Sequence, residues 1–406
     1  QEFVKQHKCN KLCKQLKLSK LKATHAPLPN KQVEVAKSPV RRLSSRDPKK
    51  RALSANAFVR SSRRGQLVQL LKGTSETTKL RRSSYVKAAK NKKKNTEDTD
   101  DAKVYTLDII DDFTVLVTLS DHKGFVSSLV LYDRLLFSGS ADKTIKVWSL
   151  DSFDCIATLE GHRKEVTALW RTDSLLFSGS MDDCVRVWKL KEPFDFVVSL
   201  QASDNINGVC VAGNTVFAAA NKTVCAWHIS GDGSDPTHYG EMKELEGHKK
   251  SIKAMSAAGN YVFTGGNDKT IRVWDAKTLE SKYVIDEHDG WIRHLSVFEK
   301  QLYSCSYDSS LKVWDLSSLA CELTVPCPQR IESCCVWNDL LFVGCEDARM
   351  RVFNVESGES VQILKEHKTA VLALTANADL VFSGSFDNTI KVWGQKVKDE
   401  NEDEEE

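Results

Sequence analysis

The residues most suggestive of chemistry are a histidine, a serine or threonine and an aspartate that recur together at constant spacing. In five places the histidine is followed after 16 residues by the hydroxyl residue, after 20 by the aspartate and after 26 by a tryptophan. The five sets are His122, Ser138, Asp142 and Trp148; His162, Ser178, Asp182 and Trp188; His248, Thr264, Asp268 and Trp274; His288, Ser304, Asp308 and Trp314; and His367, Ser383, Asp387 and Trp393. A serine activated by a histidine and an aspartate is the arrangement of a hydrolase. Because the set is repeated five times, we assign these residues to structure rather than to catalysis.

The sequence contains no glycine-rich phosphate loop, nucleophile elbow or His-Glu-x-x-His helix. A zinc site built from His7, Cys9, Cys13 and His25 fits no established ligand spacing. We therefore predict a protein without enzyme activity, metal or cofactor.

The elements that must position the repeated residues form one unit that occurs seven times. An aromatic residue closes each unit, at Trp148, Trp188, Trp227, Trp274, Trp314, Phe353 and Trp393, with spacings of 40, 39, 47, 40, 39 and 40 residues. This period, with a Ser-Gly-x-x-Asp turn before the aromatic residue, is typical of β-propeller blades. Each unit contains four short strands, such as 166–170, 175–178 and 184–188 in the second, and no helical period competes. We predict an all-β, seven-bladed β-propeller.

The segment Ser138–Trp148, SGSADKTIKVW, and its six echoes resemble the WD-repeat family over about residues 105–394. The blades are most similar to the propellers of TRAF-type ubiquitin ligases and of alpha-kinases of the myosin heavy-chain kinase type. The resemblance implies that the histidine, hydroxyl residue, aspartate and tryptophan of a blade form a hydrogen-bonded chain that fixes its turns.

Two units depart from this pattern. Ala202 and Cys327 replace the histidine in the third and sixth units, and Val343 and Phe353 replace the serine and tryptophan of the sixth. We interpret both as degenerate blades, although a functional reason for the change stays open.

The ends of the repeat region must pair, because an open row of blades would leave bare sheet edges. Residues 114–119 copy the outer strand at 156–159, directly precede Asp121 and His122, and complete the seventh unit, which otherwise ends at Trp393. We expect residues 114–119 to close the ring.

Binding is predicted on the rim where the loops of all blades meet. The position before the first strand is Phe125, Glu165, Asn205, Ser251, Trp291, Arg330 and Ala370 in blade order. The position before the turn aspartate is Ala141, Met181, Asn267, Tyr307, Glu346 and Phe386, with the third blade unclear. The partner-binding candidates are Phe125, Glu165, Met181, Trp291, Tyr307, Arg330 and Phe386. Their aromatic members either contact a partner or pack on neighbouring loops. The insertion at 229–242 is a plain surface loop or a second contact point on the opposite face.

The charge is divided between two parts of the chain. Residues 1–103 hold 28 Lys and Arg against 8 Asp and Glu, a net charge of +20, which leaves −17 for the remainder. We predict a disordered basic tail at 1–103, the propeller at 104–394 and a disordered acidic tail at 395–406. A basic tail of this kind suits an acidic protein surface or RNA. Its predicted phosphorylation sites are Ser38, Ser44, Ser45, Ser83 and Ser84.

The cysteines, the absence of a long apolar stretch and the basic clusters indicate a location. Cysteines from Cys155 to Cys345 lie at irregular positions, which is typical of reduced thiols. No stretch has the length of a membrane span, so we expect a cytoplasmic protein, or a nuclear one imported through 49–51 or 92–94. The leading hypothesis is a protein-binding scaffold whose basic tail anchors it to an acidic surface. The alternatives are the targeting module of a ubiquitin ligase or kinase, and an RNA- or ribosome-associated factor.

Overall fold

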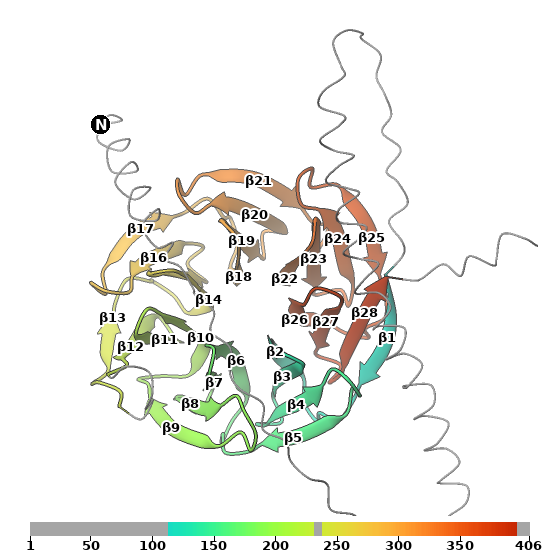
Figure 1. Ribbon diagram of the computed structural model, residues 1–406. Coiled ribbons are helices and arrows are strands. Elements are labelled where there is room, and N and C mark those ends of the chain that lie inside the picture. Colours follow the sequence, from blue (N-terminus) through green and yellow to red (C-terminus); the bar gives the residue numbers. More distant parts are fainter. Residues whose placement is uncertain (1–112, 231–237, 396–406) are drawn as a thin grey trace, which may run out of the picture. The chain divides into compact units, whose positions relative to one another are not determined.

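A computed structural model describes residues 113–230 and 238–395, and every regular element in these ranges is a β-strand. Twenty-eight strands form seven antiparallel sheets of four strands each. The sheets stand as blades around a common centre and follow one another in chain order (Figure 1). The predicted seven-bladed β-propeller is therefore confirmed.

Blades 1 to 6 each take four consecutive strands, from the innermost to the outermost. Blade 1 has β2 (Val126–Tyr132), β3 (Leu135–Ser140), β4 (Ile145–Ser149) and β5 (Cys155–Leu159). Blade 2 has β6 (Val166–Arg171), β7 (Leu175–Ser180), β8 (Cys184–Lys189) and β9 (Phe196–Gln201). Blade 3 has β10 (Ile206–Ala212), β11 (Thr215–Ala220), β12 (Thr223–His228) and β13 (Lys243–Leu245). Blade 4 has β14 (Ile252–Ala258), β15 (Tyr261–Gly266), β16 (Ile271–Asp275) and β17 (Ser281–Ile285). Blade 5 has β18 (Ile292–Phe298), β19 (Gln301–Ser306), β20 (Ser310–Asp315) and β21 (Cys321–Pro326). Blade 6 has β22 (Ile331–Trp337), β23 (Leu340–Cys345), β24 (Met350–Asn354) and β25 (Ser360–Leu364).

Blade 7 is built from both ends of the described chain. It contains β26 (Val371–Ala376), β27 (Val381–Ser385), β28 (Ile390–Gln395) and, as its outermost strand, β1 (Phe113–Leu119). β1 pairs with β28 in antiparallel register from Phe113 opposite Gln395 to Leu119 opposite Ile390. In Figure 1 the blue-green β1 lies beside the red β28. The strand expected at 114–119 thus closes the ring.

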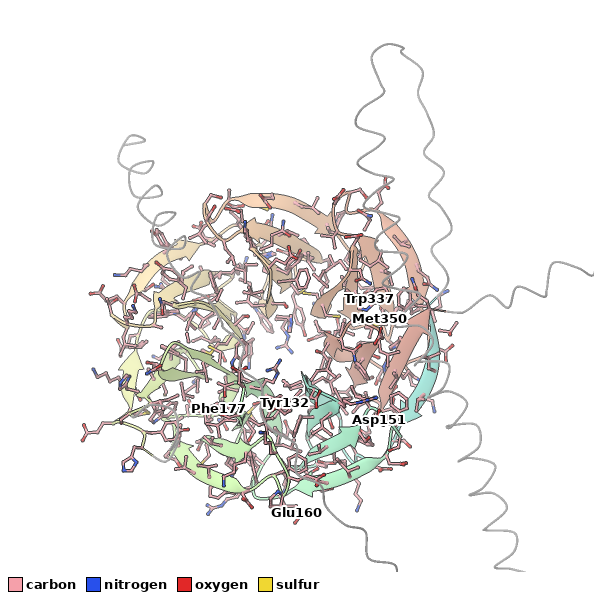
Figure 2. The ribbon with its side chains drawn as sticks, viewed as in Figure 1. Tyr132, Asp151, Glu160, Phe177, Trp337 and Met350 are labelled. Carbon is pink, nitrogen blue, oxygen red and sulfur yellow. The ribbon has the colours of Figure 1, made fainter. Side chains whose placement is uncertain are left out.

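The strand sequences match the positions of the strands within a blade. The second strand of blade 2, LLFSGS, is buried at every position because neighbouring blades cover both of its faces. The outermost strand of blade 1, CIATL, is more exposed and buries only Leu159 among its residues. Figure 2 shows Phe177 and Met350 among the packed side chains of the blades, and both are fully buried. Packing between blades therefore supplies the hydrophobic core.

The predicted tails and their boundaries at 103/104 and 394/395 concern residues largely outside the described ranges, so these boundaries stay predictions. The insertion after β12 begins with a bridge between Ile229 and Tyr239. It joins the third and fourth strands of blade 3, which places it on the face opposite the rim. The ten described cysteines are free thiols. In 113–230 and 238–395 we find no helix suited to crossing a membrane.

Candidate protein-binding rim

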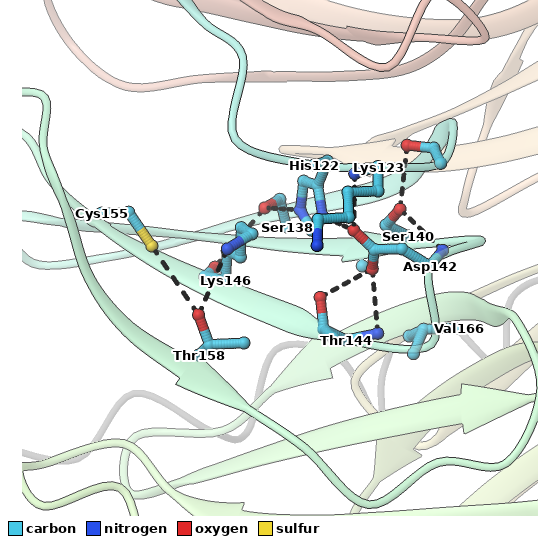
Figure 3. Close-up of polar contacts among 12 residues, drawn as sticks. His122, Lys123, Ser138, Ser140, Asp142, Thr144, Lys146, Cys155, Thr158 and Val166 are labelled. Carbon is cyan, nitrogen blue, oxygen red and sulfur yellow. Dashed lines mark hydrogen bonds and ion pairs between the residues drawn. The ribbon is translucent and has the colours of Figure 1, made fainter.

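The repeated histidine, hydroxyl residue, aspartate and tryptophan form one hydrogen-bonded chain in each of five blades. In blade 1 the two ring nitrogens of His122 lie 2.7 Å from Ser138 Oγ and 2.7 Å from Asp142 Oδ2. Figure 3 shows His122 between Ser138 and Asp142. The Trp148 indole N–H donates to the same Ser138 oxygen at 2.8 Å. Blades 2, 4, 5 and 7 repeat this geometry with distances of 2.6–3.2 Å.

This geometry does not suit a hydrolase. Ser138 is fully buried and its oxygen is engaged by both His122 and Trp148, so no substrate can reach it. Asp142 also accepts hydrogen bonds from the backbone N–H groups of Lys123 and Thr144, both at 3.0 Å. The chain therefore ties two rim loops of each blade together.

The aspartates of these chains are stabilised in their charged form. Burial opposes the ionisation of Asp142, but hydrogen bonds from His122, Thr144 and Lys123 outweigh it and hold the pKa of Asp142 below its usual value. The pKa values of Asp268, Asp308 and Asp387 are lowered in the same way. Burial alone would raise each pKa, but hydrogen bonds, led by the one from the blade's histidine, outweigh it.

Blade 3 replaces the chain with a different network. Ala202 occupies the histidine position, and the loop between β11 and β12 lacks the aspartate. Asp204 accepts the backbone and side-chain N–H groups of Asn205 at 2.7 and 3.0 Å and the side-chain amide of Asn221 at 2.9 Å. These contacts lower the pKa of Asp204, led by the Asn205 backbone N–H. The same two loops are thus joined without a histidine.

The two rim positions of each blade are linked by a backbone hydrogen bond. The amide before the turn aspartate donates to the carbonyl of the residue before the first strand. The seven pairs are Ala141 with Phe125, Met181 with Glu165, Asn221 with Asn205, Asn267 with Ser251, Tyr307 with Trp291, Glu346 with Arg330, and Phe386 with Ala370. Asn221 is therefore the position in the third blade that the sequence left unclear.

The rim aromatics form two stacked pairs. Phe125 and Phe386 stack across the closure of the ring, with centroids 4.6 Å apart and planes 10° apart. Trp291 and Tyr307 stack within blade 5 at 5.8 Å and 20°. Phe386 is 53% exposed and Trp291 is 45% exposed. Phe386 and Trp291 are therefore exposed to a partner, and each also packs on the aromatic ring beside it. Both interpretations left open by the sequence, partner contact and loop packing, apply to each pair.

Tyr307 is held by charged side chains on three sides. The guanidinium carbons of Arg293 and Arg330 lie 5.3 and 5.1 Å from its ring centroid. Its hydroxyl donates to Glu332 at 2.5 Å, and Glu332 also accepts from Arg293 at 3.0 Å. Burial and the bond to Glu332 raise the pKa of Tyr307 to about 12. We name Trp291, Arg293, Tyr307, Arg330 and Glu332 the Trp291 cluster.

Arg293 and Glu332 belong to a second ring of residues that the sequence reasoning missed. In each blade the innermost strand contains a register shift after its first residue. The residues at the shift are Ser127, Thr167, Asn207, Lys253, Arg293, Glu332 and Leu372. Several reach the next blade, as when Thr167 Oγ1 donates to the Ile206 carbonyl at 2.6 Å. Aligning the repeats two positions further than the rim would have revealed this ring.

The second ring is unevenly charged, with hydroxyls in blades 1 and 2 and ionisable groups in blades 4 to 6. Lys253 Nζ donates to the neutral amide oxygen of Asn207 at 3.1 Å. Burial and the nearby charge of Arg293 lower the pKa of Lys253. An anionic group of a ligand would therefore be stabilised beside Lys253.

The remaining candidates are separated from this cluster or lie outside the described residues. Glu165 and Met181 form the rim pair of blade 2, and both are partly buried. The five predicted phosphorylation sites between Ser38 and Ser84 and the cysteines at 9 and 13 fall outside the described residues. In residues 113–230 and 238–395 no group of three potential ligands could hold a metal ion.

Comparison with known proteins agrees with the geometry. The WD40 family (WD domain, G-beta repeat) matches residues 113–149, 153–189, 240–275, 279–315 and 358–394. Each match contains the outermost strand of one blade and three strands of the next. The five matches coincide with the five hydrogen-bonded chains, whereas the repeats that end at Trp227 and Phe353 are not matched.

Relatives include zinc finger CCCH domain-containing protein 17 of Oryza sativa subsp. japonica, 29% identical over 37% of this chain and 36% of the relative. Human F-box/WD repeat-containing protein 9 is 25% identical over 37% of the chain and 36% of its own length. Nuclear distribution protein nudF of Aspergillus terreus is 41% identical over 20% of the chain and 18% of its length. The chain spans about a third of the first two relatives. The narrower resemblance to TRAF-type ligases and alpha-kinases stays a prediction. The described part of the chain is a seven-bladed propeller that contains five matched WD40 repeats.

Proposed function

We propose that the propeller is a non-enzymatic platform that binds a protein partner on its rim, with the Trp291 cluster as the main contact. The observation that carries the proposal is an exposed tryptophan already fixed by its surroundings. Trp291 stacks on Tyr307, which Arg293, Arg330 and Glu332 hold in place. Tryptophan, tyrosine and arginine dominate the energies of protein interfaces, and a preorganised anchor loses little entropy on binding.

The second part of the proposal concerns the basic tail at 1–103, which anchors the complex to an acidic surface. Its net charge of +20 supports such a contact. Phosphate at Ser44, Ser45, Ser83 and Ser84 would remove about 1.5 to 2 charges per site and weaken it. Replacing these four serines by glutamate should therefore reduce anchoring.

The rim proposal is tested with Trp291→Ala in the full chain and Phe298→Ala as the matched control. Phe298 ends β18 on the opposite face of the same blade and is 40% exposed. Quantitative affinity capture should lose a specific set of proteins with Trp291→Ala and retain it with Phe298→Ala. Both variants should melt within a few degrees of the unmodified protein. Identical captured sets for the two variants would refute binding through the Trp291 cluster.

A second candidate function is the recognition module of a larger enzyme, a ubiquitin ligase or a kinase. It is supported by relatives such as F-box/WD repeat-containing protein 9, whose name includes a further domain. A third, attachment to RNA or the ribosome, rests on the charge of the tail alone. Nuclease treatment before affinity capture tests this third candidate, because it would remove only those partners that are held through RNA.

The proposed location is the cytoplasm, with nuclear import through 49–51 or 92–94 as the alternative. Imaging of the fluorescently tagged full chain, with and without alanines at Lys92, Lys93 and Lys94, distinguishes the two.

A further inference from the structure

Blade 6 contains two thiols where other blades carry the histidine and a serine. Cys327 occupies the histidine position, directly after β21, and Cys345 ends β23. Their sulfur atoms are 3.6 Å apart, within hydrogen-bonding distance. Cys327 is 6% exposed and Cys345 is fully buried. Two cysteines, at positions where other blades have a histidine and a serine, thus form a close thiol pair just beneath the rim.

A buried arginine lies beside this pair. Arg351 is 3% exposed, and its two terminal nitrogens donate to Asp347 at 3.0 and 2.7 Å. Its Nε has no hydrogen-bond partner among the described residues. The hydrogen bonds to Asp347 raise the pKa of Arg351 against the effect of burial, and the neighbouring Cys345 and Cys327 raise it further. A guanidinium beside the pair can stabilise a thiolate.

The two thiols differ in acidity. The hydrogen bond with Cys345 lowers the pKa of Cys327 to about 7 against the effect of burial, with help from the Gln329 backbone and Arg351. The same hydrogen bond and burial raise the pKa of Cys345. Cys327 is the more accessible of the two thiols and the one whose pKa is lowered, so we assign it as the nucleophile and Cys345 as its partner.

Several other buried cysteines have pKa values shifted in the opposite direction. Burial alone raises the pKa of Cys210, and burial also raises that of Cys335. Cys305 and Cys334 belong to the same hydrophobic cluster as the pair, and burial raises the pKa of Cys305. Among the described cysteines whose pKa is shifted, only Cys327 has a lowered value, and the thiolate is the form that reacts with oxidants.

We propose that Cys327 and Cys345 form a peroxide-sensitive modification site that closes as a disulfide across blade 6. The Cys327 thiolate attacks one peroxide oxygen, the O–O bond breaks, and the second oxygen leaves as water or an alcohol after taking a proton. The resulting sulfenic acid is attacked by the sulfur of Cys345, and the S–S bond forms with loss of water. The two thiols lose two electrons and the peroxide gains two.

The site goes beyond the proposed function and connects to it through the rim. Cys327 precedes Arg330 by three residues, and Cys345 directly precedes Glu346. A disulfide brings its sulfurs to about 2.05 Å, so the two rim loops of blade 6 would be drawn together and pinned. The effect on binding rests on the proposed function, whereas disulfide formation does not.

Peptide mapping of the full chain tests the site without a partner. The protein is treated with hydrogen peroxide, alkylated and digested with trypsin, Glu-C and Asp-N. Cys327 then lies in residues 323–330 and Cys345 in residues 339–346, with no other cysteine in either peptide. We expect these two peptides to be linked after peroxide and separated by reductant. Alkylated Cys327 and Cys345 with no link, or a link only between other cysteines, would overturn the proposal.

Two variants identify the roles within the pair. Cys345→Ser should leave a sulfenic acid at Cys327 that dimedone traps. Arg351→Gln should slow alkylation of Cys327 at pH 7 about fivefold, the effect of raising a thiol pKa of about 7 by about one unit, and Arg351→Lys should restore most of the rate. Cys210 and Cys335 report unfolding, because they must stay protected in every variant. Dimedone labelling spread equally over all cysteines would also refute the assignment.

Discussion

Blades 5 and 6 are neighbours with the same four-strand topology, but they bind their turn aspartate in different ways. In blade 5, His288, Ser304, Asp308 and Trp314 are joined by hydrogen bonds of 2.6–2.9 Å. In blade 6 an inward-turned Arg351 satisfies Asp347, while thiols and apolar side chains occupy the remaining positions. The same turn can therefore be fixed by a histidine-centred chain of hydrogen bonds or by an arginine–aspartate ion pair. Blade 6 thus has two thiols in place of a histidine and a serine.

The largest expected effect comes from cutting the chain in blade 5. Ser304→Ala leaves two buried groups, His288 Nε2 and the Trp314 indole N–H, without their hydrogen-bond partner. At about 1–3 kcal/mol for each orphaned group, the free energy of unfolding should fall by about 2–6 kcal/mol. Urea denaturation measures the change.

Ser304→Thr is the matched control, because blade 4 uses Thr264 at this position with the same two bonds at 2.8 Å. The threonine variant should stay within about 1 kcal/mol of the unmodified protein. Equal losses for alanine and threonine would show that packing, not the hydroxyl, accounts for the effect.

A smaller loss is expected from breaking the ion pair of blade 6. Arg351→Met removes two charge-assisted hydrogen bonds to Asp347, whose side chain is 20% exposed. We expect the unfolding free energy to fall by about 1–3 kcal/mol. Arg349→Ala is the control, since Arg349 is 47% exposed and lies 3.8 Å from the same carboxylate. It should change stability by less than about 0.5 kcal/mol. If both variants behave alike, the burial of Arg351 contributes nothing to the pair.

The strand pattern and the number of blades follow from the sequence because they depend on a regular period. The closing strand also follows, since residues 114–119 repeat the outer strand of blade 1. The inward turn of Arg351 does not, because the matching Lys146 and Lys312 extend along the sheet toward Thr158 and Thr324. Arg351 turns toward Asp347 because blade 6 has no histidine to bind this carboxylate. The spacing of residues along a repeat does not show whether a histidine or an arginine will bind the turn aspartate.

The rim illustrates the same limit. The position of Trp291 was predicted from repeat alignment, whereas Arg293 and Glu332 were missed. These two residues belong to different blades, and their contact at 3.0 Å arises from the shift in each innermost strand. Asp204 was missed because the loop in blade 3 is built differently from those used in the alignment. Contacts between repeats therefore require the three-dimensional structure.

The smallest effect is on the pH dependence of stability. Burial opposes the charge of Asp308, but hydrogen bonds from His288, Ser310 and Asp289 outweigh it and lower its pKa from 3.8. A depressed folded-state pKa gives stability that is present above about pH 4 and is lost as the pH falls below it. Asp308→Asn removes the titrating carboxyl group. The difference in unfolding free energy between this variant and the unmodified protein should therefore become smaller below pH 4.

Asp347→Asn extends this test to blade 6, where hydrogen bonds from Arg351 outweigh burial and lower the pKa of the aspartate. The difference in urea midpoint between each variant and the unmodified protein, measured from pH 2.5 to 7, should narrow toward the acid end. Parallel curves over the whole range would mean that these carboxylates titrate equally in the folded and unfolded states.

The pairing of β1 with β28 also governs how the protein is made. Leu119 is synthesised 276 residues before Gln395. At about 5–20 residues per second, the first strand waits about 14–55 s on the ribosome for its partner. During that time Phe113 and Leu119, which are buried in the finished ring, have no strand to cover them. A chain that stalls before Ile390 therefore carries an unpaired edge from its earliest strand, which makes late truncations substrates for chaperones and for aggregation.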